Sequence, residues 1–249
     1  MIPVLHRAQE KQAPPGIGVE IDVWLTLGPA TVVSHDPPKV TNHLFYQWLR
    51  DDVRRAGFRP LYAVDCKTDG LENDVASCFD RLGVPRDRWF ALDMSHPSQK
   101  AFAKAGLPFA ERVSEEEPWR GHSKRIWLDR WMWGDNAVAF LKGGMSVSRT
   151  PGVGLYLPPD AEVHVVSVEL HVQTATWVDR VQWWKWLIEE VRPVSICTDY
   201  PDELLEVLGS QSFTSSSAEH GFIRFLAPPS DEPRPRRSMP AAPRSEPTP

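Results

Sequence analysis

Eight short segments with strand-like character, most of them separated by helical segments, constrain the fold of this chain more than any other feature. The predicted strands cover residues 2–7, 18–24, 60–67, 89–95, 108–113, 125–130, 164–170 and 193–200. The predicted helices cover residues 41–56, 69–83, 97–106, 175–191 and 201–208. Strands that alternate with helices pair in parallel. Eight such units predict an α/β fold, a (β/α)8 TIM barrel.

The first two predicted strands are joined without a helix. Residues 8–18 contain two prolines and two glycines, which break regular structure, so this connection is predicted to be a loop. The first βα helix of the barrel is therefore expected to be missing. We assign the barrel domain to residues 1–226. Residues 227–249 are rich in proline and nearly free of large apolar side chains, which predicts a disordered tail.

Two carboxylates share one face of the second predicted strand. Glu20 and Asp22 are two residues apart, and residues i and i+2 of a strand project on the same side. The apolar residues that alternate with them form the other face, which we expect to be buried. Two such acids repel each other unless a cation lies between them, and oxygen ligands suit a hard divalent ion such as Mg²⁺ or Ca²⁺. The alternative is an acid pair that is solvated or bonded to Lys and Arg.

Acidic side chains recur near the C-terminal ends of the predicted strands. In a parallel barrel these ends converge on one rim, where active sites of this fold are built. The seven acids are Asp22, Asp65, Asp93, Glu111, Asp129, Glu169 and Asp199. The basic side chains expected among them are His6, Arg7, His35, Lys67 and Arg112. One acid alone could cap the helix that follows its strand, but seven carboxylates on one rim need cations to balance them.

Charge and composition argue against several classes of partner. The chain of 249 residues has a net charge of −5 and a pI near 5.9, which disfavours nucleic acid or an anionic membrane bound by bulk electrostatics. No run approaches the roughly 18 apolar residues that span a bilayer, and the first twelve residues lack an apolar signal-peptide core, so we expect a cytoplasmic protein. Cys66, Cys78 and Cys197 form no CxxC pair, which favours buried free thiols over disulfides or a zinc site.

Four short motifs occur in an order that resembles a known enzyme family. They are HR at 6–7, ExD at 20–22, HD at 35–36 and VDCKTDG at 64–70. This set resembles the glycerophosphodiester phosphodiesterases, which belong to a wider group of barrels that includes the phosphatidylinositol-specific phospholipases C. The later segments LDMSHP, FAERVSEEEP, IWLDRW and VSVELH resemble a bacterial branch of this superfamily. The resemblance covers most of the chain up to about residue 208.

The resemblance implies an activity and assigns roles to residues. It implies metal-dependent hydrolysis of a small-molecule phosphodiester, with Mg²⁺ or Ca²⁺ as the ion and two histidines as acid and base. The matched positions are His6 and His35 for the acid/base pair, Glu20, Asp22 and Asp65 for the metal ligands, and Arg7 and Lys67 for phosphate binding. Trp131 and His171 are candidate contacts to the leaving group, although Trp131 also suits core packing.

Two departures from the family pattern bear on activity. Ala8 stands where the HRG motif of the family has glycine, and the missing first helix could open the barrel wall or move His6. Two other functions stay open at this point. One is another metal-dependent barrel enzyme, such as a sugar isomerase or aldolase, which would not need the HR, ExD and HD order. The other is a barrel that has lost catalysis and binds a ligand. The alcohol groups of the substrate, the ion and the oligomeric state are also left open.

Overall fold

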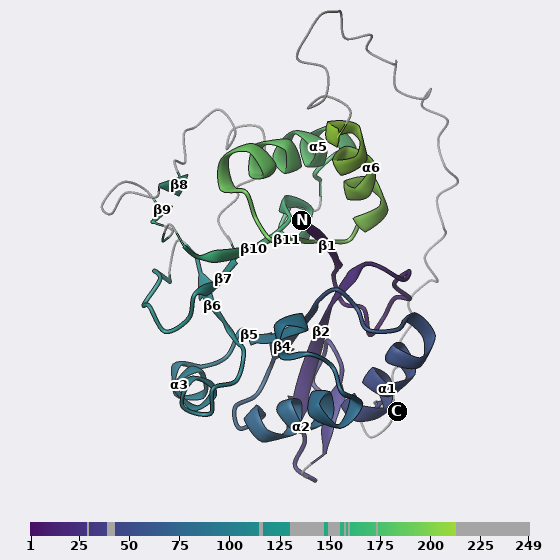
Figure 1. Cartoon of the computed structure of the whole chain (residues 1–249), viewed down its shortest axis with the longest axis vertical. Coiled ribbons are helices and arrows are strands. Elements are labelled where there is room, and N and C mark those ends of the chain that lie inside the picture. The colour runs from purple at the N-terminus through teal and green to yellow at the C-terminus, as the bar shows by residue number, and fades with distance from the viewer. Residues whose placement is uncertain are drawn as a thin grey trace, which may run out of the picture.

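Eight parallel strands form a barrel with helices around its outside (Figure 1). The computed structural model describes residues 1–28, 30–38, 43–114, 117–129, 147–148, 155–156, 158, 160–172 and 174–212. The barrel strands are β1 (Ile2–Leu5), β2 (Gly18–Leu25), β4 (Tyr62–Cys66), β5 (Trp89–Leu92), β6 (Ala110–Val113), β7 (Arg125–Leu128), β10 (Glu162–Val166) and β11 (Ser195–Thr198). They lie side by side in chain order, as in a TIM barrel. The predicted fold class is confirmed, and each predicted strand matches one of the eight.

Two joins between neighbouring strands of the barrel differ in how many residues pair across them. At one join, β1 pairs with β11 in parallel along its whole length. At the other, β5 and β6 meet among the described residues through a single bridge between Ala91 and Phe109. There the Ala91 N–H donates to the carbonyl of Pro108 at 3.1 Å. The wall is therefore nearly complete, with its thinnest point between β5 and β6.

Three further short strands of the described residues lie outside the barrel wall. β3 (Thr31–Val33) pairs antiparallel with the end of β2 and leads the chain back toward the rim. β8 (Val147–Ser148) and β9 (Leu155–Tyr156) pair with each other in a separate sheet.

Five α-helices of the described chain cover the barrel (Figure 1). They are α1 (Phe45–Ala56), α2 (Glu72–Leu82), α3 (His96–Lys104), α5 (Trp177–Trp186) and α6 (Pro201–Ser212), and α5 continues into a π-helical turn, Leu187–Val191. Local sequence sets their ends: Thr176 and Asp179 form a capping box at the start of α5, and Gly83 ends α2 in the left-handed conformation. Among the described helices, none is both long and apolar enough to cross a membrane.

The strands separate two apolar regions. Val19, Ile21 and Val23 of β2 face outward and join the core shared with the helices, as expected from their alternation. The inward faces of the strands fill the barrel with side chains that include Phe90 and Trp127. On β2 the inward positions are instead Glu20 and Asp22, which are almost fully buried. The barrel interior therefore changes from apolar to acidic toward one end.

The loop between β1 and β2 takes the place of the missing helix. Residues 6–17 form turns and irregular loop, which agrees with the predicted loop from residue 8 onward, whereas residues 6–7, predicted as the end of the first strand, belong to the loop instead. The fully buried guanidinium group of Arg59 donates to three backbone carbonyls of this loop and pairs with Asp52 at 2.7 Å. Ala8 does not take a positive φ, and its N–H donates to the carbonyl of Glu20 at 2.9 Å, so the position does not require glycine. The barrel wall is not opened here, because β1 still pairs with β2.

The predicted strand 164–170 is wrong in its second half. β10 ends at Val166, and Val168–Leu170 form a 3₁₀ turn. The hydroxyl group of Ser167 donates to Glu169 and accepts from the indole N–H of Trp184, so these polar contacts stabilise a turn rather than a continued strand. Residues 227–249, predicted to form a disordered tail, lie outside the described residues.

Candidate active site

A pocket of about 350 Å³ lies where the barrel strands end. Apolar side chains such as Leu92, Trp127 and Val166 form part of its lining. Its polar lining residues are His6, Arg7, Glu20, His35, Asp65, Lys67, Asp93, Asp129 and His171. The structure therefore brings together, at one rim, most of the charged residues that the sequence places at strand ends.

Three carboxylates form the centre of this site. Asp22 of β2 and Asp65 of β4 are direct neighbours in the parallel register, and Glu20 lies two residues before Asp22. One oxygen from each of the three lies within 4.8 Å of the others, and all three residues are buried. Oxygen atoms grouped in this way could hold a hard divalent ion. This is the trio that the family resemblance of the sequence implies as metal ligands.

The carboxylates repel one another and are poorly solvated. Burial, together with the charges of Asp22 and Asp65, raises the pKa of Glu20 well above its ordinary value. Burial also raises the pKa of Asp65, to about 7, against the opposing effect of Lys67. Burial disfavours the charge of Lys67, but Asp65 and Asp22 outweigh this effect and raise the pKa of its ammonium group. The site therefore attracts positive charge strongly.

Lys67 supplies part of that charge but leaves one oxygen unsatisfied. Its Nζ lies 2.9 Å from Oδ1 of Asp22 and also pairs with Oδ2 of Asp65. Oδ1 of Asp65 is buried and has no hydrogen-bond partner. A buried, unpaired carboxylate oxygen is costly unless a cation binds it. The donor set therefore fits a divalent ion even with Lys67 in place.

The loop after β1 holds His6 and Arg7 at the pocket. Nδ1 of His6 lies 3.1 Å from Oδ1 of Asp199, which also pairs with Lys11 at 2.5 Å. Burial would raise the pKa of Asp199, but the hydrogen bonds from His6 and Lys11 lower it to about 2. Arg7 has a φ of 52°, and its backbone N–H donates to Oε2 of Glu20 at 2.8 Å. Asp199 thus orients the ring of His6.

His35 reaches the pocket from the turn after β3. Its ring pairs with Asp36 at 3.2 Å and is about one third exposed. Two bonds hold the turn against β2: the Ser34 N–H donates to the carbonyl of Asp22 at 3.1 Å, and the indole N–H of Trp24 donates to the carbonyl of Ser34 at 2.8 Å. Both predicted histidines therefore line the same pocket as Glu20 and Asp65.

A second group of charges lines the pocket through β5 and β7. Asp93 follows β5 with a φ of 57° and pairs with Arg112 of β6, which also pairs with Glu117. Burial raises the pKa of Asp93, and Arg112 opposes this rise. Asp129 follows β7 and lies 2.6 Å from Nε2 of His171. Asp93, Asp129 and His171 therefore add further charged groups to the pocket lining beside Glu20 and Asp65.

Two of the predicted rim acids have structural roles instead. Glu111 does not line the pocket: its buried carboxylate accepts from the backbone N–H groups of residues 120, 122 and 123 and holds that loop. Glu169 lies in the 3₁₀ turn and accepts from the hydroxyl groups of Ser167 and Thr198. Both expectations were wrong because local polar partners satisfy these acids. Trp131, a candidate substrate contact, lies outside the described residues.

Sequence reasoning missed two loop residues that contact the site acids. Lys11 pairs with Asp199, and the side-chain amide of Gln9 donates to Asp22 at 2.5 Å. The only sequence signal is the position of polar side chains two and four residues after Arg7. In a loop this spacing has no fixed direction, so it could not be assigned without the structure.

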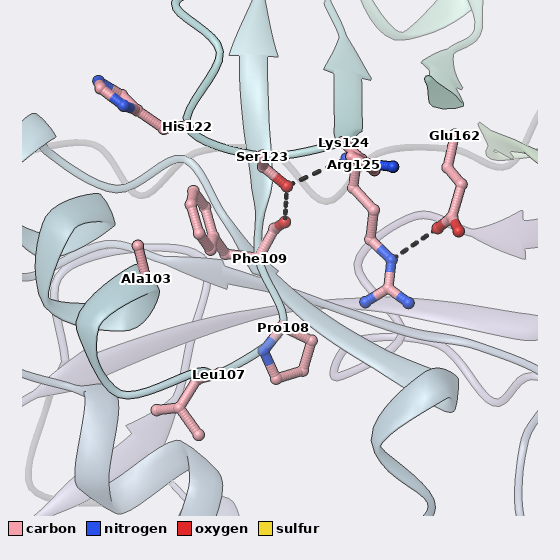
Figure 2. A pocket seen from close by; sticks show the side chains of 9 residues that line it. All are labelled: Ala103, Leu107, Pro108, Phe109, His122, Ser123, Lys124, Arg125 and Glu162. Atoms are coloured by element: carbon pink, nitrogen blue, oxygen red, sulfur yellow. Dashed lines mark hydrogen bonds and ion pairs between the residues drawn. The ribbon is translucent and has the colours of Figure 1, made fainter. Parts of the chain in front are cut away.

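A second hollow lies at the opposite ends of the barrel strands (Figure 2). It is lined where β6, β7 and β10 begin, by residues that include Phe109 and Arg125. Arg125 pairs with Glu162 at 2.8 Å, and the hydroxyl group of Ser123 donates to the carbonyl of Phe109 at 2.6 Å (Figure 2). Polar groups at this end of a TIM barrel commonly serve stability. We assign no reaction to this hollow.

Comparison with known proteins extends the description of the fold. No protein-family model and no curated protein matches the chain. The structure is similar to the glycerophosphodiester phosphodiesterase of Agrobacterium tumefaciens str. C58, with a TM-score of 0.54 and 14% identity, covering 82% of this chain and 99% of that chain. A glycerophosphodiester phosphodiesterase of Parabacteroides distasonis ATCC 8503 gives a TM-score of 0.54 and 14% identity, covering 85% and 98%. At this identity the likeness concerns the fold, and the chain has the TIM-barrel fold of solved glycerophosphodiester phosphodiesterases.

Proposed function

We propose that this protein is a metal-dependent hydrolase of small phosphodiesters. One observation carries the proposal: a single pocket at the C-terminal strand ends is lined by two histidines, an arginine, a lysine and two of the three carboxylates of a potential metal site, Glu20 and Asp65. Each of these groups has a use in cleaving an anionic diester. The printed names of the similar structures, glycerophosphodiester phosphodiesterases, agree with this choice of reaction.

Glu20, Asp22 and Asp65 would hold the ion. A divalent ion such as Mg²⁺ or Ca²⁺ neutralises phosphoryl charge and lowers the pKa of a hydroxyl group bound beside it. The carboxylates must lose their protons before they bind an ion, so the raised pKa values of Glu20 and Asp65 predict tighter binding above neutral pH.

His6 and His35 would move the protons. One imidazole accepts the proton of the attacking hydroxyl group, and the other donates a proton to the leaving oxygen. Imidazole suits both tasks because its ordinary pKa lies near neutrality. The bond between Nδ1 of His6 and Asp199 leaves Nε2 of His6 as the nitrogen available for proton transfer.

Arg7 and Lys67 would bind the phosphate oxygens. Both line the pocket, and an anionic diester compensates the positive charge that these residues place beside the carboxylates. Lys67 pairs with Asp22 and Asp65 in the described structure, so it would exchange part of this pairing for the phosphate when an ion binds. His171 is the proposed contact to the leaving group, and Trp131 remains a candidate for the same role.

The pocket size limits the substrate to a small molecule. A volume of about 350 Å³ lies at the lower end of the range for small-ligand sites. It suits a phosphodiester with one small alcohol, such as a glycerophosphodiester. A sugar isomerase or aldolase would not need the HR, ExD and HD motifs in this order.

The proposal is tested by hydrolysis of bis(p-nitrophenyl) phosphate. The purified protein is incubated with Mg²⁺, Mn²⁺ or Ca²⁺ in turn, and with a chelator as the blank. We expect nitrophenolate release with at least one ion and none with the chelator. Silence with all three ions, while calorimetry detects ion binding, would favour an isomerase or a non-catalytic binding protein instead.

A further inference from the structure

The loop that replaces the first helix contacts the site acids at every second residue. The Arg7 backbone N–H binds Glu20, the Gln9 side chain binds Asp22, and Lys11 pairs with Asp199. The loop itself is fixed by the buried Arg59, which holds its second half through backbone carbonyls. The loop of the shortened first unit therefore packs against the site and contacts its acids.

Gln9 makes the most specific of these contacts. Its Nε2 donates to Oδ2 of Asp22 at 2.5 Å, and its Oε1 accepts from the backbone N–H of Asp22 at 3.4 Å. One amide group therefore binds both the side chain and the main chain of the same residue. Such a two-point contact restricts rotation of the Asp22 carboxylate, because turning the carboxylate breaks the first bond while the second holds the amide in place.

We propose that Gln9 is a positioning residue for the metal ligand Asp22. This inference rests on the proposed function, since it takes the carboxylate trio as the ion site. Gln9 binds Oδ2 of Asp22, whereas Lys67 binds Oδ1. Because Lys67 also pairs with Asp65, Oδ1 of Asp22 lies on the side of Asp65, and the bond from Gln9 to Oδ2 holds it in that orientation.

The chemistry of an amide suits this role better than that of a charged group. A cation on Oδ2 would neutralise Asp22 and weaken its attraction for the ion. A neutral amide orients the carboxylate and leaves its negative charge intact. Hydrogen-bond partners that orient metal ligands in this way typically account for about 10- to 100-fold in metal affinity.

The test is the affinity of the protein for Mn²⁺ and Ca²⁺, measured by isothermal titration calorimetry at pH 8. Gln9→Met keeps the length and the apolar stem of the side chain but removes both hydrogen bonds, and Gln9→Ala serves as a second variant. Gln12→Ala is the matched control, because Gln12 is an exposed glutamine of the same loop. We expect about tenfold weaker ion binding in both Gln9 variants and no change in the control. The midpoint of thermal unfolding in a chelator should stay within a few degrees of the wild type for all three.

The possible outcomes separate this inference from the proposed function. If the wild type binds an ion and both Gln9 variants bind it equally well, the positioning role is refuted while the metal site stands. If the Gln9 variants lose stability in the chelator but keep their affinity for the ion, the contact is structural only, and the inference fails. If the wild type binds neither ion, the inference and the metal-dependent function fail together.

Discussion

Replacing Asp65 by asparagine should stabilise the protein when no ion is bound. In the folded chain, burial raises the pKa of Asp65 from its ordinary 3.8 to about 7, even with Lys67 beside it. A folded-state pKa above the unfolded value means that the folded state binds more protons between these two pH values. The free energy of unfolding therefore falls as pH rises from 3.8 to about 7, and the whole loss is present above pH 7. Asparagine keeps the shape of the protonated acid and never ionises.

The size of the effect follows from the pKa values. A shift of about three units corresponds to about 4 kcal/mol, at 1.36 kcal/mol per unit. The attraction of Lys67 is already contained in this figure, since it lowers the pKa that burial raises. For a chain of this length, a change of this size shifts the midpoint of thermal unfolding by roughly 10 °C.

The assay is urea unfolding of the wild type and the Asp65→Asn variant in a chelator, from pH 4 to pH 8. The two proteins should have similar free energies of unfolding near pH 4, and the variant should become more stable as pH rises to 8. Asp87→Asn is the control, because Asp87 is exposed and its replacement removes no buried carboxylate. With Mn²⁺ added at pH 8, only the wild type should gain stability.

One result would refute this reasoning. If Asp65→Asn is less stable than the wild type at pH 8 in the chelator, the pairing of Asp65 with Lys67 outweighs the cost of its burial. The carboxylate trio would then be a stabilising salt-bridge cluster, and the case for a strained ion site would be lost.

Three further variants test other parts of the site. His35→Ala should reduce metal-dependent diesterase activity by at least about 100-fold, the usual contribution of a proton-transferring side chain, while circular dichroism shows an intact fold; unchanged turnover would remove its assigned role. Asp199→Asn should lower the free energy of unfolding at pH 7 but not near pH 2. The folded-state pKa of Asp199, lowered to about 2, stabilises the fold at pH values above the ordinary pKa of 3.8, and this contribution is lost as pH falls toward 2. An equal loss at both pH values in urea unfolding would contradict this. Glu111→Gln should destabilise the fold by about 1–3 kcal/mol through its backbone contacts yet keep the activity per folded molecule, so a selective loss of turnover would return Glu111 to the site.

The barrel could be predicted from the sequence because its strands are local patterns joined by a simple rule. Each strand is a short apolar segment, and parallel pairing in chain order needs no further information. The same rule placed Asp22 beside Asp65, since adjacent parallel strands bring their C-terminal ends to one rim. The grouping of acids at one rim was therefore within reach of sequence reasoning, whereas the choice of Asp65 as the third ligand rested on the resemblance to a family.

The misassigned acids depended on partners that are not visible in the sequence. Glu111 is satisfied by N–H groups of the loop that follows its strand, and Glu169 by two hydroxyl groups. The contacts of Gln9 and Lys11 depend on the path of a loop that a distant residue, Arg59, holds in place. Such loop geometry arises from tertiary contacts, and no periodic pattern encodes it.

The join between β5 and β6 is the thinnest point of the barrel wall. At the other join, four consecutive residue pairs tie β1 to β11, whereas here one bridge and the ion pair between Asp93 and Arg112 connect the two strands. Local opening of the barrel wall should therefore begin between β5 and β6. In hydrogen exchange, the amide of Ala91 should take up deuterium before the amide of Val64 does. Asp93 also lines the pocket, so a ligand that orders this side chain would hold β5 and β6 together and slow that exchange.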